Sequence, residues 1–260
     1  MKRRSNAKVH DTRGEYTRFI DNNPIPIPTE FNQKKFSSLD LKNVNPMTLN
    51  QQRVFDLWAD DYSMVLAGSA GSGKSFVALY LALAEVLDKV NGYEKVIIVR
   101  SAVPTRDLGF LPGTLEEKTE VYELPYAQLF DDLFKKKHQY KHLKAAGVVE
   151  FVTTANIRGL TWDNAIIVYD EFQSSTYHEL ATVATRLGKN SKVIYCGDLA
   201  QNDLITKKND VSGFTKFVGI VDRMPEFRKV YFMHADIVRS GFCKSFIIAE
   251  EEWNAANPGQ

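Results

Sequence analysis

The sequence predicts an α/β fold in which a mainly parallel sheet is covered by helices on both faces. Short apolar runs alternate along the chain with longer stretches that can form helices, the order expected of parallel strands joined by helical crossovers. The runs are almost continuously apolar, as expected of strands that are buried on both faces. A glycine-rich stretch at 68–75 joins one such run to a helical segment without Gly or Pro, an arrangement found in α/β proteins.

Six apolar runs are expected to form the strands, at about 63–67, 95–100, 148–152, 165–169, 192–196 and 228–233. Helices are expected at about 48–58, 76–90, 114–144, 174–187, 211–222 and 240–252. The first helix should be capped by Thr48 or Asn50, whose side-chain oxygens can accept a hydrogen bond from a backbone N–H. Pro125 is expected to break the helix at 114–144, because proline removes a helical donor.

The 260 residues suffice for one large domain with tails. We expect an extended, basic arm over residues 1–45, a core over 46–252 and a frayed tail over 253–260. The arm holds nine basic and five acidic side chains, and it alternates Pro with Ile at 24–28, which disfavours helix. The arm could dock along a body or a neighbouring subunit, bind nucleic acid, or stay disordered, and the sequence leaves these possibilities open.

Composition argues against a membrane or secreted protein. No run of eighteen apolar residues occurs, and the basic N-terminus lacks the apolar region of a secretory signal. Cys196 and Cys243 have neither metal-ligand spacing nor a close partner, so we expect reduced thiols. The net charge of +1 favours no class of partner. We therefore expect a cytoplasmic protein, in the host cytoplasm if its compact form reflects a phage origin.

The glycine-rich stretch matches the pattern G-x-x-x-x-G-K-[ST] at every fixed position. A strand before it and a helix after it would aim backbone N–H groups and a helix N-terminus at a chain of phosphates. Lys74 would reach the β- and γ-phosphates, and Ser75 would place its hydroxyl on Mg²⁺. The expected nucleotide-binding residues are Gly68, Ser69, Ala70, Gly71, Ser72, Gly73, Lys74 and Ser75. The expected cofactors are therefore ATP and Mg²⁺.

A phosphate-binding loop of this kind needs an acidic partner for its metal. The apolar run at 165–169 is followed by Asp170 and Glu171. Asp170 is expected to hold the magnesium shell together with Ser75, and Glu171 is the candidate base that orients or deprotonates the attacking water. A single aspartate would suit many nucleotide switches, whereas the Asp-Glu pair favours hydrolysis.

Two glutamines are candidates for contacts with the nucleotide. Gln201 follows the strand at 192–196, and ligands gather at the carboxyl ends of parallel strands, so Gln201 could sense the γ-phosphate and water. Gln52 could hold both N6 and N7 of adenine with its amide. Gln51 is the alternative adenine reader, and a solvated glutamine is a further alternative for this position.

Taken together, these residues resemble the PhoH family of phosphate-starvation-inducible P-loop ATPases over about residues 45–250. The resemblance rests on Gly68–Ser75, Leu108–Gly113, Ile157–Gly159, Asp170–Gln173, Thr185–Gly188, Gly197–Gln201 and Asp236–Arg239. It implies a RecA-like core similar to the first motor domain of superfamily 1 helicases, ATP hydrolysis, and linkage to RNA or single-stranded nucleic acid. Nothing in the sequence matches the PIN nuclease domain fused to some members, so no nuclease activity is expected.

The sequence departs from the family pattern at several positions. Ser101 stands where the family usually has Pro, and Phe172 and Ser174 replace the usual Ala and Asn. Leu160 replaces the second arginine of the common Arg-Gly-Arg-Thr motif. The last change weakens the expectation that this loop contacts phosphates or completes a neighbour's site.

The resemblance also raises the question of which arginine completes the site, because a two-domain helicase takes one from its second motor domain. A stabilising arginine is worth about 10³–10⁵ in rate for this chemistry. Arg239 resembles the helicase arginine that touches the γ-phosphate from the same domain, and Arg186 could reach a neighbouring subunit. We therefore expect a homo-oligomeric ring, with six subunits favoured, although Arg186 could instead be a salt-bridged helix end.

The candidate contacts to nucleic acid lie in the loops after the second and third strands. In helicase-like folds such loops contact the phosphates of the bound strand, and polar and cationic side chains suit this role. The candidates are Arg100, Ser101, Thr105, Arg106 and Arg158. The alternative function is a nucleotide-gated assembly or adaptor protein with slow hydrolysis and no nucleic-acid track. A small-molecule kinase is disfavoured, because no lid with an acceptor pocket can be recognised.

Overall fold

The computed structural model describes residues 19–20, 23–24, 36–101, 115–198 and 213–257, which fall into two units. In the first unit, strand β1 (Phe19–Ile20) pairs antiparallel with β2 (Asn23–Pro24). The second unit begins at Phe36, and it contains all of the helices and strands discussed below.

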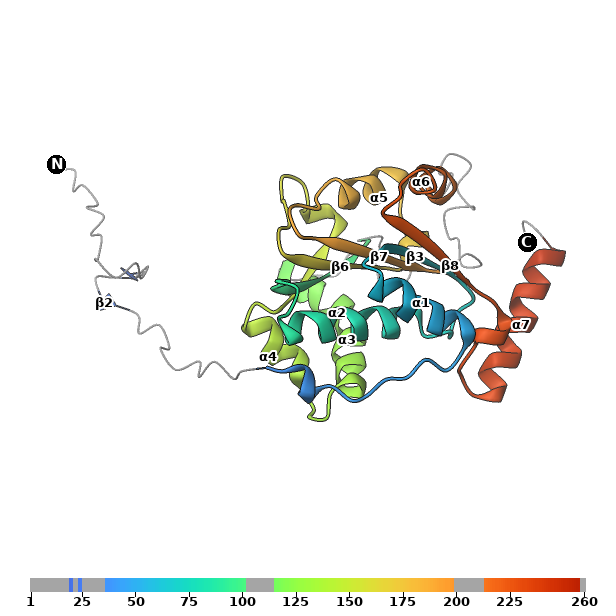
Figure 1. Cartoon of the computed structure of the whole chain (residues 1–260), viewed down its shortest axis with the longest axis horizontal. Coiled ribbons are helices and arrows are strands. Elements are labelled where there is room, and N and C mark those ends of the chain that lie inside the picture. Colours follow the sequence, from blue (N-terminus) through green and yellow to red (C-terminus); the bar gives the residue numbers. More distant parts are fainter. Residues whose placement is uncertain (1–18, 21–22, 25–35, 102–114, 199–212, 258–260) are drawn as a thin grey trace. The chain divides into compact units, whose positions relative to one another are not determined.

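A six-stranded, all-parallel sheet forms the centre of the second unit (Figure 1). In spatial order its strands are β5 (Val149–Thr153), β4 (Lys95–Arg100), β6 (Ala165–Asp170), β7 (Lys192–Gly197), β3 (Ser63–Gly68) and β8 (Phe227–Phe232). The predicted parallel sheet is thus confirmed, and each of its six strands lies within one or two residues of the expected run.

Helices cover both faces of this sheet, as predicted. One face carries α1 (Leu49–Ala59), α2 (Lys74–Asp88), α3 (Leu115–Leu133) and α4 (Gln139–Ala145), and the other carries α5 (Tyr177–Ala184) and α6 (Phe214–Val221) (Figure 1). Short 3₁₀ turns lie at Ser38–Asp40, Thr154–Asn156, Phe172–Ser174 and His234–Asp236.

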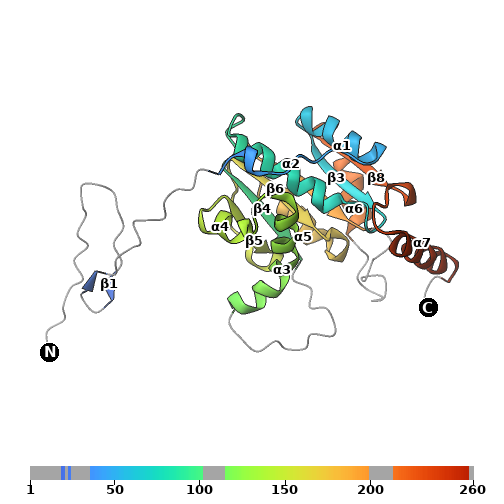
Figure 2. The same ribbon diagram turned by 90° about the horizontal axis from the view of Figure 1, so that it is seen from below.

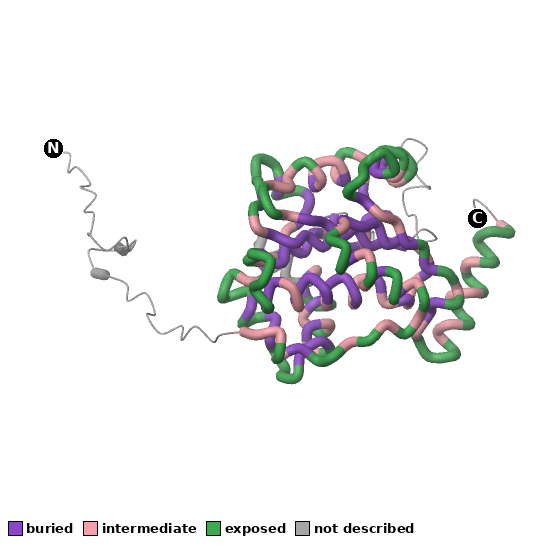
Figure 3. Tube along the Cα trace, viewed as in Figure 1, coloured by how far each residue is buried: buried purple, intermediate pink, exposed green. Residues whose placement is uncertain are grey.

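Alternate residues of each strand feed two separate cores. In β6, Ile166 and Val168 pack with α2 and α3, whereas Ile167 and Tyr169 pack with α5 and α6. Every residue of β6 and β7 is buried, and the strands form a continuous buried band in Figure 3. Burial on both faces explains why these strands appear in the sequence as unbroken apolar runs.

The break in the long helix differs from the prediction. Thr48 caps α1 by accepting a hydrogen bond from the backbone N–H of Gln51, as expected. Helix α3, however, runs through Pro125 to Leu133, and the chain turns at His138, whose φ is +63°. The expected break at Pro125 is therefore wrong: the proline is accommodated inside the helix, and the interruption falls between α3 and α4.

Helix α7 (Gly241–Ala256) lies beside the β8 edge of the sheet in both ribbon views (Figures 1 and 2). It continues three residues past the start of the tail expected at 253. None of its residues is fully buried, and Phe242, Phe246 and Trp253 are exposed. Within the described ranges, no helix is both long enough and apolar enough to cross a membrane.

Candidate functional site

The candidate site lies at the carboxyl ends of three neighbouring strands, where the backbone of a parallel sheet opens toward ligands. β6 ends at Asp170, β7 at Gly197 and β3 at Gly68, with β7 between the other two. Parallel pairing in this register brings the phosphate-loop candidate and the acidic pair to the same edge of the sheet, although about 100 residues separate them in sequence.

The loop from Gly68 to Ser75 has the backbone geometry that its glycines predict. Gly68, Gly71 and Gly73 all have positive φ, and Gly73 is the left-handed residue from which α2 starts. A Cβ on Gly68 would come within 2.0 Å of the carbonyl oxygen of Phe232 on the neighbouring strand. Only glycine fits that position without moving the backbone. The loop therefore presents the N-terminus of a 15-residue helix to the site.

Lys74 turns back over this loop. Its Nζ donates to the carbonyl oxygens of Gly68 at 2.9 Å and Ser69 at 2.7 Å, and to Ser72 Oγ at 3.3 Å. Burial lowers the pKa of Lys74, while the nearby charge of Asp198 acts in the opposite direction. The ammonium is thus held at the loop, where backbone carbonyls rather than water satisfy it.

Asp170 is the carboxylate that meets the loop. Its Oδ1 accepts a hydrogen bond from Ser75 Oγ at 2.5 Å, and its Oδ2 accepts one from Tyr126 Oη at 2.9 Å. Asp170 is only 7% exposed, so these two donors satisfy a carboxylate that water barely reaches. Burial, followed by the charge of Asp170, raises the pKa of Tyr126 well above its ordinary value, so the phenol stays a donor.

Glu171 follows directly and adopts a left-handed backbone with φ of +55°. Gln173 orients its carboxylate, because Gln173 Nε2 donates to Glu171 Oε2 at 2.6 Å. The other amide atom, Gln173 Oε1, accepts from the backbone N–H of Asp198 at 3.0 Å and so ties this turn to the end of β7. Burial raises the pKa of Glu171 above 4.5, and the charge of Asp170 adds to that shift.

The side chains of the two glutamines of α1 point to different surroundings. Gln51 is 4% exposed, its Nε2 donates to the carbonyl of Ser72 at 2.9 Å, and its Oε1 accepts from the N–H of Met47 at 2.8 Å. Gln52 is exposed and donates to Asp56 Oδ1 within its own helix. Gln51 therefore contacts the phosphate loop, whereas Gln52 bonds within its own helix. Reading of adenine by Gln52, with Gln51 as the alternative, stays a prediction.

Arg239 lies against the outer side of the loop. A Cβ on Gly71 would come within 2.7 Å of Arg239 Cγ, and the N–H of Val238 donates to the carbonyl of Gly71 at 3.1 Å. Helix α7 adds a carboxylate here, since Glu251 Oε2 accepts from Ser69 Oγ at 3.2 Å and lies 2.6 Å from His234 Nε2. The segment that follows β8 is thus fastened to the loop at several points.

A family comparison agrees with this geometry. A model of the PhoH-like protein family matches residues 43–251. The chain belongs to the PhoH family. It is 33% identical over 221 residues to the PhoH-like protein of Mycobacterium leprae (strain TN), covering 84% of this chain and 61% of that protein. Over 179 residues it is 33% identical to Protein PhoH of Escherichia coli (strain K12), covering 68% and 49%.

The chain thus spans less than two thirds of the length of these two PhoH relatives. Among solved structures, the large terminase from a thermophilic bacteriophage in complex with ADP matches with a TM-score of 0.46 and 13% identity. That match covers 82% of this chain and 51% of the terminase chain.

The residues predicted to contact nucleic acid fall into different surroundings. Arg100 ends β4, with its guanidinium 6.0 Å from the ring centre of Tyr122, and Arg158 is exposed in the turn after β5. Ser101 is buried, and its Oγ donates to Glu179 at 3.0 Å. Thr105, Arg106 and the γ-phosphate candidate Gln201 lie outside the described residues.

Glu179 lies in the first turn of α5 and accepts a hydrogen bond from the Ser101 hydroxyl. Burial alone would raise the pKa of Glu179, but hydrogen bonds from Thr154, Thr176 and Ser101 outweigh it and lower the pKa. The Ser101 hydroxyl is therefore already engaged in the fold.

Arg186 is not part of the assembled site. Its backbone carbonyl accepts from the N–H of Trp162 just ahead of β6, which places it at the amino ends of the strands. Its Nη1 donates to the carbonyl of Leu160 at 3.3 Å, and its Nε is buried without a hydrogen-bond partner.

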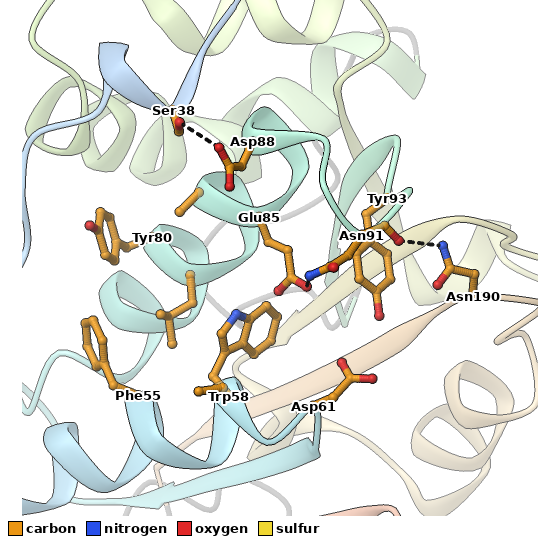
Figure 4. Close-up of a pocket in the computed structure, with 13 residues that line it drawn as sticks. Ser38, Phe55, Trp58, Asp61, Tyr80, Glu85, Asp88, Asn91, Tyr93 and Asn190 are labelled. Atoms are coloured by element: carbon orange, nitrogen blue, oxygen red, sulfur yellow. Dashed lines mark hydrogen bonds between the residues drawn. The ribbon is translucent and has the colours of Figure 1, made fainter.

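A separate hollow of about 820 Å³ lies near these amino ends and away from the phosphate loop. Trp58, Asp61, Glu85 and Tyr93 converge on it (Figure 4). Lys192 lies beside it, paired with Asp61 at 2.8 Å and Glu85 at 3.0 Å, with its Nζ 3.7 Å from the ring centre of Trp58. These two ion pairs and the ring contact connect the start of β7 to the end of α1, to the turn after it and to α2.

Tyr126, Gln173 and Glu251 are three site residues that the sequence interpretation did not identify. Gln173 stands two residues after the predicted base, so its spacing was a usable signal. Tyr126 and Glu251 reach the site from helices distant in sequence, and no local pattern marks them.

Replacing Gln51 with Ala should lower the free energy of unfolding by about 1–3 kcal/mol, because it leaves the buried backbone carbonyl of Ser72 without its donor. The neighbouring change Gln52→Ala is the matched control and should stay within about 0.5 kcal/mol, since Gln52 is exposed. Chemical denaturation followed by circular dichroism measures both. Equal losses in the two variants would contradict the distinction.

Proposed function

We propose that this chain is a Mg²⁺-dependent ATPase that couples ATP hydrolysis to RNA or single-stranded nucleic acid. The observation that carries the proposal is the contact of Ser75 with Asp170 at 2.5 Å across 95 positions of sequence. A hydroxyl from a phosphate loop beside a buried carboxylate is the arrangement by which P-loop enzymes hold their metal.

The residues at this contact fit Mg²⁺. The ion prefers oxygen ligands and is usually held by one or two protein oxygens, with water and substrate phosphates completing its shell. Ser75 and Asp170 would hold the ion, which when bound neutralises charge on the β- and γ-phosphate oxygens.

Lys74 and Glu171 supply the remaining chemistry in this proposal. Lys74 would exchange the carbonyls of Gly68 and Ser69 for phosphate oxygens. Glu171 would accept a proton from the attacking water, and its raised pKa brings it closer to the range of an effective base. Gln173 would keep the carboxylate aimed through its 2.6 Å hydrogen bond. Gln201 stays a prediction as the γ-phosphate sensor.

Replacing Glu171 with Gln should lower ATP turnover by about 10²–10⁴-fold while nucleotide binding persists, because the variant cannot accept the proton. The raised pKa further predicts that, on acidification, wild-type turnover is lost at a higher pH than an ordinary glutamate would give, since the carboxylate must be deprotonated to act. Steady-state phosphate release across pH measures both. Glu150→Gln is the control, because Glu150 pairs with Lys95 away from the site. Turnover of Glu171→Gln equal to wild type would refute the assigned role.

Arg239 is the proposed in-domain arginine, supported by its position against Gly71.

Arg186 lies at the amino ends of the strands, away from this site, so any role for it requires a neighbouring subunit. We propose a ring, with six subunits favoured. Sedimentation velocity with a non-hydrolysable ATP analogue should therefore reveal an oligomer larger than a dimer. A monomer at all protein concentrations would rule out the ring and leave Arg186 without a catalytic part.

The nucleic-acid proposal rests on Arg100 and Arg158. β4 and β5 are neighbours, and Arg100 pairs in register with Thr153 at the end of β5, so the segments that follow both strands start from the same edge. Thr105 and Arg106 remain proposed contacts. These cationic side chains follow β4 and β5, and β4 is the neighbour of β6, which ends in Asp170. Cationic side chains suit the backbone of a single-stranded nucleic acid.

Single-stranded RNA or DNA should accelerate ATP turnover, and binding should weaken as salt rises. Arg158→Ala should reduce the slope of log K against log salt by about 0.7, the value for one lost phosphate contact on a single strand. Arg228→Ala is the matched control, because Arg228 packs on Tyr62 at the amino end of β8. If neither RNA nor DNA accelerates ATP turnover, the proposed coupling to nucleic acid is wrong, and the result favours the nucleotide-gated assembly.

A further inference from the structure

Tyr126 contacts the metal-binding candidate Asp170 from a helix that the sequence does not connect to the site. It stands on α3 and is 1% exposed, and its ring packs against Phe151 of β5 with centroids 5.6 Å apart. Its hydroxyl donates to Asp170 Oδ2 at 2.9 Å across 44 positions of sequence.

We propose that Tyr126 is a positioning residue that holds the Asp170 carboxylate in the orientation needed for Mg²⁺, and that it thereby sets the Mg²⁺ dependence of nucleotide binding. The inference rests on the proposed function, because it assumes that Ser75 and Asp170 form the metal site. The chemical class of the ligand is a divalent cation bound together with a nucleotide.

The argument starts from how the two oxygens of Asp170 are used. Oδ1 faces Ser75 and Oδ2 faces Tyr126, so rotation of the carboxylate about its Cβ–Cγ bond would break both contacts. The backbone of Asp170 is fixed as the last residue of β6, which is hydrogen-bonded between β4 and β7. The remaining freedom of the side chain is its rotation, and Tyr126 removes it.

Tyr126 can do this because close packing restrains its own side chain. The ring is fully buried in the core between α3 and the sheet, so the hydroxyl cannot follow a moving carboxylate. Groups that hydrogen-bond a metal ligand in this way typically change metal affinity about 10–100-fold when removed. The expected phenotype is therefore a change in metal dependence, rather than in the affinity for the nucleotide alone.

The chain offers a matched control in Tyr140. It is 4% exposed, and its hydroxyl donates to a carboxylate oxygen of Glu123, also at 2.9 Å. Glu123 pairs with Lys144 on α4 and not with the phosphate loop. Tyr126→Phe and Tyr140→Phe thus delete the same kind of contact, the first at the metal-binding candidate and the second between α4 and α3.

The experiment titrates Mg²⁺ against binding of a fluorescent ADP analogue, with EDTA for the metal-free affinity. Tyr126→Phe should raise the Mg²⁺ concentration at half-maximal effect by about tenfold, with less than a twofold change in metal-free affinity. Tyr140→Phe should match the wild type in both. 4-Fluorophenylalanine at position 126, which fills the hydroxyl volume without donating, should behave like Tyr126→Phe and replaces it if that variant does not fold.

Three results would overturn the inference. One is a Mg²⁺ dependence for the position-126 variants equal to that of wild type. Another is an equal shift in Tyr140→Phe, which would indicate a general loss of packing. The third is a wild-type nucleotide affinity that does not change with the Mg²⁺ concentration, which would also contradict the metal site of the proposed function. The first two leave the proposed function standing, so the two failures can be told apart.

Discussion

The structure depends on one buried carboxylate. Asp170 ends a strand buried on both faces, and it must be satisfied by donors because water barely reaches it. The donors come from two directions: Ser75 at the start of α2 and Tyr126 in the middle of α3. These two hydrogen bonds connect the end of β6 to both helices. The way in which α2 and α3 pack on the sheet therefore also sets the geometry of the proposed metal site.

The sequence was sufficient for the fold and the centre of the site. Continuous apolar runs predicted the parallel sheet, since strands covered on both faces need no polar side chains. The spacing of the glycines with Lys74 predicted the phosphate loop. Glycine is needed at position 68 because a side chain there would collide with the backbone of Phe232. Asp170 followed from its position at a strand end. Each of these features is encoded by a few consecutive residues. Such residues can be interpreted without knowing which distant segments pack against them.

The rest of the site depends on contacts between distant stretches. Tyr126 and Asp170 are brought together by the packing of α3, which no local pattern encodes. Which of Gln51 and Gln52 contacts the phosphate loop depends on the rotation of α1 about its axis, which the sequence left open. Pro125 was expected to break its helix, but a helix packed along a core can keep going past one missing hydrogen bond. Each of these outcomes was decided by tertiary packing rather than by local preference.

The partners of Lys74 link ligand occupancy to the stability of the fold. The Lys74 ammonium is already dehydrated in the fold, where it donates to backbone carbonyls. The free energy of its dehydration therefore contributes to folding and not to the binding of a ligand. A phosphate that replaces those carbonyls meets a cation with little water left to shed. A nucleotide bound at the proposed site would therefore raise the resistance of the fold to unfolding by mass action.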